Sequence, residues 1–128
     1  MQPKTVRVIK VKHLDRTRQF YEALGYVLVE EQHKKGPIHY SVDFGLCVYE
    51  FYPSESGSHV APPKGDFWIV DVRRFDEVLR VSNELDLDRD PVKYYDPDQK
   101  LRSAIFEDPD GRRILVREVG YDPPPPVH

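Results

Sequence analysis

Cysteine is almost absent from this sequence, since Cys47 is the only one among 128 residues. A single cysteine cannot form an internal disulfide, and it cannot build the cysteine cluster of a structural zinc site. An isolated cysteine of this kind is more often a small buried hydrophobe than a nucleophile. This cysteine usage favours a reducing compartment, and we expect a cytoplasmic protein.

Long apolar runs and basic blocks are absent too. No apolar segment approaches the ~18–20 residues of a membrane span, and the first residues show no signal-peptide core. The formal net charge is -3 without clustered Lys or Arg, which argues against nucleic acid as a partner. No phosphate-binding loop or nucleophile elbow occurs. We therefore expect neither a membrane nor nucleic acid to be the partner.

What the sequence does contain is a doubled pattern in a chain with the length of a single domain. Hydrophobic residues make up 39% and charged residues 32%, as in soluble globular proteins. Each half reads as a strand, a helix and three further strands, so we predict an α+β fold of two βαβββ repeats. The repeats span about 5–52 and 67–119, with helices at 14–24 and 74–85, a linker at about 53–66 and a loose proline-rich tail at 120–128.

Two strands in the first half form a predicted hairpin, 38–43 and 46–52. With Phe44 and Gly45 as its loop, the numbers of paired residues add up to 89, and His39 lies opposite Glu50. Alternation then gives one apolar face for the helix and one polar face for a wet cleft. The apolar face is Ile38, Tyr40, Val42, Cys47, Tyr49 and Phe51; the polar face is His39, Ser41, Asp43, Val48, Glu50 and Tyr52.

A turn at Asp108-Pro109-Asp110-Gly111 leads into the last strand. Proline presets the φ angle of a turn, aspartate accepts hydrogen bonds from nearby backbone N–H groups, and glycine tolerates a positive φ. We therefore predict a β-turn here, with Gly111 at a positive φ.

Residues 20–26 (Phe-Tyr-Glu-Ala-Leu-Gly-Tyr) and 108–114 (Asp-Pro-Asp-Gly-Arg-Arg-Ile) resemble two motifs of the vicinal oxygen chelate superfamily, at the end of its first helix and in its final hairpin. This superfamily includes glyoxalase I, extradiol dioxygenases, and fosfomycin- and bleomycin-resistance proteins. The resemblance extends from about Thr5 to Glu118. It implies a curved mixed sheet with a concave cleft (the glyoxalase/bleomycin resistance fold), a small-molecule ligand and a homodimer.

Metal-binding members of this superfamily place His or Glu on the first and last strands of each half. Carried over by resemblance, those positions are Val6, Glu50, Phe67 and Leu115. Only Glu50 can coordinate a metal, because valine, phenylalanine and leucine have no donor atom. We therefore expect no bound metal and no cofactor.

Glu50 and its predicted neighbour His39 are the candidate catalytic residues. They can form a partial metal site, an acid–base pair, or an ion pair without chemistry. His33 falls in a loop, where we expect it to be solvated. The remaining candidates are ligand-binding residues that provide apolar and aromatic walls or polar anchors: Val6, Val8, Ser41, Val48, Tyr52, Phe67, Arg113 and Leu115.

These residues support three hypotheses. The first is a metal-independent small-molecule-binding protein, similar to the bleomycin-resistance branch. The second is a lyase or a dioxygenase-type enzyme that uses Glu50, with His39, as a base or a partial metal site. The third is a structural module whose cleft is vestigial.

Overall fold

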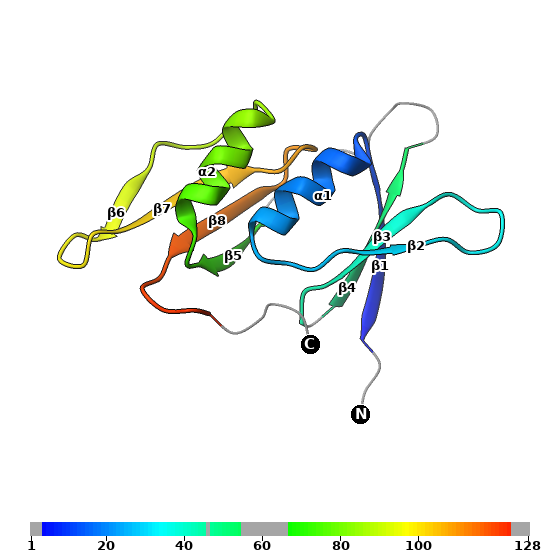
Figure 1. Cartoon of the computed structure of the whole chain (residues 1–128), viewed down its shortest axis with the longest axis horizontal. Helices are drawn as coiled ribbons and strands as arrows, with labels where there is room; N and C mark the ends of the chain where they lie inside the picture. The colour runs from blue at the N-terminus through cyan, green and yellow to red at the C-terminus, as the bar shows by residue number, and fades with distance from the viewer. Residues whose placement is uncertain (1–3, 46, 55–66, 124–128) are drawn as a thin grey trace. The chain divides into compact units, whose positions relative to one another are not determined.

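A computed structural model describes residues 4–45, 47–54 and 67–123 of the chain, which fall into two compact units, one on either side of the gap at 55–66 (Figure 1). Most of the expected linker at 53–66 and the end of the expected tail, 124–128, lie outside these residues. Within the described ranges, no helix is long and apolar enough to cross a membrane.

The first unit is a helix on a four-stranded sheet. Its elements are β1 (Thr5–Val11), α1 (Leu14–Ala23), β2 (Val29–Glu31), β3 (His39–Asp43) and β4 (Cys47–Pro53). The strand order is β1-β4-β3-β2, with β1 parallel to β4 and the other neighbours antiparallel.

The second unit repeats this topology. Its elements are β5 (Phe67–Val72), α2 (Phe75–Glu84), β6 (Lys93–Asp96), β7 (Leu101–Glu107) and β8 (Arg113–Glu118). The order β5-β8-β7-β6 again pairs the first and last strands in parallel. The predicted α+β fold with two βαβββ repeats is therefore confirmed.

Each helix packs its apolar stripe on the sheet of its own unit. On α1 the buried residues are Thr17, Phe20 and Tyr21, and the Tyr21 ring stacks on Phe51 of β4 with centroids 5.2 Å apart. On α2 they are Phe75, Val78, Val81 and Ser82. Spacings of three and four residues place such side chains on one helical face. Each unit therefore has one sheet face covered by its helix; the other is called its open face below.

The end of α1 explains why β2 begins only at Val29. Gly25 has a φ of 100°, and its N–H donates to the Glu22 carbonyl while that of Tyr26 donates to the Tyr21 carbonyl. This is a Schellman cap, in which the residue after the helix adopts a left-handed conformation. Tyr26 is consequently part of the helix end, and its ring is buried rather than paired in a strand.

The predicted register of the β3–β4 hairpin is wrong by two residues. The paired numbers add up to 91, so Ser41 rather than His39 lies opposite Glu50. The Phe44 N–H donates to the Cys47 carbonyl, and Gly45, the first residue inside the turn, has a φ of 93°. A two-residue hairpin loop with glycine first has this geometry. Since side chains alternate with a period of two, the shift leaves both predicted faces intact.

The turn before β8 has the predicted form. One carboxylate oxygen of Asp108, Oδ1, accepts hydrogen bonds from the N–H groups of Asp110 (2.9 Å) and Arg112 (2.8 Å). Gly111 has a φ of 86°, in the left-handed region.

Gly111→Val should therefore lower the free energy of unfolding by about 1 kcal/mol or more, because a β-branched residue is strained at this φ. Urea denaturation at pH 7 measures the loss. Gly120→Val is the matched control, since Gly120 has an ordinary φ and open space at the point where a side chain would begin. Equal stability of the two variants would contradict the strained turn.

Candidate binding site on the first unit

The open face of the first sheet carries the candidate residues of that unit. Strand pairing sets Val6 beside Val48 and Val8 beside Glu50 across β1 and β4, and Ser41 beside Glu50 across β4 and β3. The neighbours of these residues along the strands, such as Phe51 and Val42, are buried under α1. Alternation therefore places the predicted residues of the first unit on one surface.

His39 is the buried centre of this surface, with 1% of its area exposed. Its ring stacks on Tyr52, with centroids 4.0 Å apart and planes 10° from parallel. The corrected register makes these two residues cross-strand neighbours and Glu50 the diagonal neighbour of His39. His39 Nε2 lies 3.3 Å from Glu50 Oε2. The expected proximity of His39 and Glu50 is thus present, although the two residues are not directly opposite.

Two further residues join the cluster from β2 and the loop after it. Glu31 is paired with His39 across β2 and β3, and its Oε1 lies 3.9 Å from His39 Nε2. The His33 ring lies 5.0 Å from the His39 ring, tilted by 34°. Sequence reasoning placed His33 in a loop and missed its position beside His39. The loop is only seven residues long, which returns its start close to β3.

The cluster has a negative electrostatic character. Burial, followed by the charges of Glu50 and Glu31 and a side-chain hydrogen bond with Glu50, raises the pKa of the Tyr52 hydroxyl. Two carboxylates therefore face one buried imidazole and a phenol that keeps its proton at neutral pH. Such an arrangement can accept hydrogen bonds, take up a proton, or bind a cation.

The remaining candidates lie in the second unit. Leu115 is paired with Ile69, whose side chain is 53% exposed on the open face of that sheet. Arg113 donates to Asp90 at 3.1 Å and Arg117 to Asp71 at 2.9 Å, so each arginine already has a carboxylate partner. The structure describes the backbone of Phe67 but not its side chain.

The usual metal centre of the superfamily does not fit these residues. Of the four carried-over positions, only Glu50 has a donor atom. The strand partners are no better, because Val8 lies beside Glu50 and Ile69 beside Leu115. Aliphatic side chains do not coordinate metals, so one carboxylate would be left to hold the ion.

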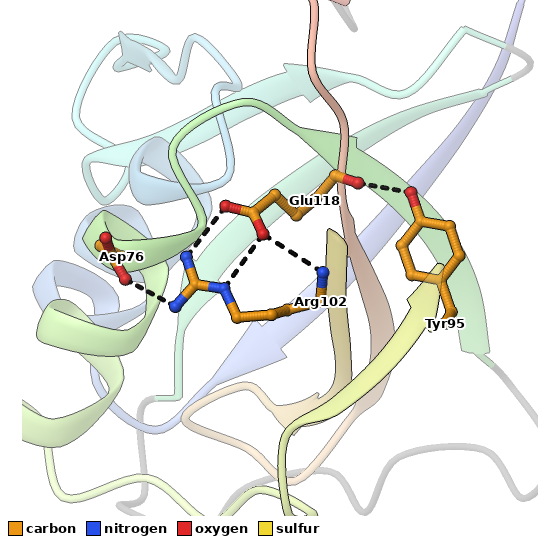
Figure 2. Close-up of polar contacts among 4 residues, drawn as sticks. All are labelled: Asp76, Tyr95, Arg102 and Glu118. Carbon is orange, nitrogen blue, oxygen red and sulfur yellow. Dashed lines mark hydrogen bonds and ion pairs between the residues drawn. The ribbon is translucent and has the colours of Figure 1, made fainter. Parts of the chain in front are cut away.

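A second polar network, which sequence reasoning missed, lies on the helix-covered face of the second sheet (Figure 2). Arg102 of β7 donates to both carboxylate oxygens of Glu118 on β8 (3.0 and 2.9 Å) and to Asp76 of α2 (2.9 Å). Its guanidinium also lies 4.9 Å from the centre of the Phe75 ring. The Tyr95 hydroxyl donates to the Glu118 carbonyl. The contacts of Arg102 join α2 to the sheet.

Neither a search of protein-family models nor a search of curated proteins found a match. Solved structures, by contrast, share this topology. Among solved structures, a glyoxalase family protein from Enterococcus faecalis is 21% identical, with a TM-score of 0.52, and the match covers 92% of this chain and 97% of that one.

Two further structures are equally informative. The fosfomycin resistance protein FosX from Mesorhizobium loti is 17% identical with a TM-score of 0.59, and the match covers 93% of each chain. A glyoxalase/bleomycin resistance protein from Albidiferax ferrireducens is 16% identical with a TM-score of 0.57, covering 90% of this chain and 97% of that one. The chain thus has the glyoxalase/bleomycin resistance fold.

Proposed function

We propose that the chain is a small-molecule-binding protein that holds its ligand on the open face of the first sheet, without the usual metal centre of this fold. The observation that carries the proposal is an exposed apolar surface next to buried polar groups. Val6 and Val8 are 53% and 60% exposed, whereas His39 on the same face is buried. Ligand sites combine apolar walls with a few fixed polar groups in this way.

The chemistry of the surface indicates what kind of ligand fits. The valines of β1 and Val48 of β4 can cover an apolar part of the molecule. Glu50, whose side chain is 21% exposed, can accept a hydrogen bond from a donor group or pair with a cationic one. We therefore expect an organic molecule with an apolar body and at least one donor group.

Glu50→Gln tests this proposal. Native mass spectrometry of metal-free protein against a library of amphiphilic amines, phenols and carboxylic acids should identify ligands that bind the wild type. The substitution should weaken the best amine or phenol about tenfold or more, which corresponds to about 1.4 kcal/mol. The free energy of unfolding should change by less than about 1 kcal/mol, because Glu50 is not fully buried.

Glu30→Gln is the matched control, since Glu30 is an exposed glutamate of β2 paired with Tyr40 on the opposite face. Its ligand affinity should equal that of the wild type. Equal affinities for all three proteins, or a library without a single binder, would contradict the proposed site. Sedimentation of the same samples tests the expected homodimer.

The alternative function is a lyase or dioxygenase-type enzyme. The distance of 3.3 Å between His39 Nε2 and Glu50 Oε2 is the observation that supports it. Glu50 would remove a proton from a carbon next to a carbonyl group, and His39 would orient the carboxylate. Solvent deuterium incorporation into a bound carbonyl compound, lost in Glu50→Gln and kept in Glu30→Gln, would support this enzyme.

A further inference from the structure

We propose that His33, His39 and Glu50 bind a divalent transition-metal ion on the first unit, at a site that shares only Glu50 with the four positions discussed above. One nitrogen or oxygen atom from each of these residues lies within 4.8 Å of the others. The expectation of a metal-free protein rested on Glu50 as the single donor among the four carried-over positions, with His39 completing no more than a partial site. The position of His33 supplies the third ligand that firm binding requires. The inference goes beyond ligand binding on the same face.

The orientation of the His39 ring is the main argument. Its Nδ1 lies 3.2 Å from the Pro37 carbonyl oxygen, which can only accept, so Nδ1 carries a proton. In the neutral ring Nε2 then presents a lone pair. Metal-binding histidines are held by this arrangement, with the second nitrogen donating to a backbone carbonyl.

The surroundings of Nε2 point the same way. Among the residues that the structure describes, this buried nitrogen has no hydrogen-bond partner, although Glu50 Oε2 is 3.3 Å and Glu31 Oε1 3.9 Å away. A lone pair facing two carboxylates in a buried position is unfavourable unless something positive lies between them. A metal ion bound at Nε2 supplies that charge.

The donor set favours the metal ion. Two imidazoles and one carboxylate suit zinc, nickel and cobalt, and three protein ligands leave a coordination position open for water or a ligand. Tetrahedral ligands around zinc are about 3.3 Å apart, so the cluster must contract slightly. His33 is exposed and lies in the loop between β2 and β3, where a change of side-chain rotamer can bring it closer. Glu31 lies near enough to provide a fourth ligand.

The experiment is a calorimetric titration of the chelator-treated full chain with zinc chloride at pH 7.5, repeated with cobalt chloride and absorption spectroscopy. We expect one zinc ion per chain and a visible cobalt spectrum of a four- or five-coordinate site. His33→Asn and Glu50→Gln should each weaken zinc about tenfold to a hundredfold. His33 is exposed, so His33→Asn avoids the folding loss that a change at buried His39 would risk.

His13→Asn is the matched control, because His13 is an exposed histidine of the same unit without a side-chain hydrogen bond at the start of α1. Its zinc affinity should equal that of the wild type. Absence of zinc binding to the wild type, or equal affinities for the wild type and His33→Asn, would overturn the site. Because the small-molecule assay uses metal-free protein, either proposal can fail without the other.

Discussion

Replacing Asp108 by alanine is expected to lower the free energy of unfolding by about 3–5 kcal/mol, the largest effect predicted for this chain. The Asp108 carboxylate is buried, and its oxygens accept from two backbone N–H groups and from Arg112 Nη1 (3.3 Å). The Arg112 side chain is itself only 4% exposed. Without Asp108, two backbone donors and much of a buried guanidinium would lose their acceptor. In the described part of the chain, the guanidinium would keep its ion pair with Asp110 Oδ2, 3.6 Å from Nη1.

Urea denaturation at pH 7, followed by circular dichroism, measures this loss. Asp98→Ala is the matched control, because Asp98 is an exposed aspartate of the turn between β6 and β7, and its removal should cost less than about 0.5 kcal/mol. A double variant, Asp108→Ala with Arg112→Leu, should be more stable than Asp108→Ala alone, since it removes the unpaired charge. A loss at Asp108 no larger than at Asp98 would show that the turn does not depend on this carboxylate.

Arg102→Met is expected to cost about 2 kcal/mol at pH 7, because charged hydrogen bonds to a half-buried carboxylate contribute more than exposed ion pairs do. Arg102 makes a two-pronged contact with Glu118 (Figure 2). Its guanidinium also lies over the Phe75 ring. Arg80 of α2 provides the control. It also contacts two carboxylates, Glu77 and Glu84, but on an exposed helix surface, so Arg80→Met should cost much less than Arg102→Met. Equal costs for the two substitutions would contradict the argument from burial.

The Arg102 contact also predicts a pH dependence. Hydrogen bonds from Arg102 lower the pKa of Glu118 below its ordinary value of 4.5. A depressed pKa in the folded state contributes stability above the unfolded pKa, and this contribution disappears as the pH falls through the folded value. The difference in unfolding free energy between the wild type and Arg102→Met should therefore be full at pH 7 and smaller at pH 3. A difference that grows on acidification would assign the opposite sign to the interaction.

The sequence predicted the elements well where a local rule decides the structure. Gly25 ends α1 and Gly111 forms its turn because left-handed backbone favours glycine. Alternation gave the faces of β3 and β4 correctly, but the register depended on whether Phe44 or Gly45 begins the turn. Both choices keep the same faces, so the hydrophobic pattern could not distinguish them.

The candidate site was predicted less completely, for a physical reason. His39 and Glu50 share a face through alternation along neighbouring strands, which a sequence displays. His33 and Glu31 join them through the course of a loop and the pairing of a short strand, which carry no periodic signal. Arg102 was missed because its carboxylate partners are distant in sequence. From alternation alone, an arginine is expected to point to solvent rather than toward a helix.

The repeated topology has a consequence for how substitutions will be tolerated. By strand pairing, the second-unit counterpart of Glu50 is Leu115, and that of Ser41 is Ile105. At these two positions the same architecture thus carries polar side chains in one copy and aliphatic ones in the other. Each copy packs its own helix on its own sheet, so chemistry on the open face can diverge without altering the core beneath it. In a library of variants, we therefore expect substitutions in the two units to be tolerated independently. Polar replacements on the open face of the second unit should leave the first unit folded.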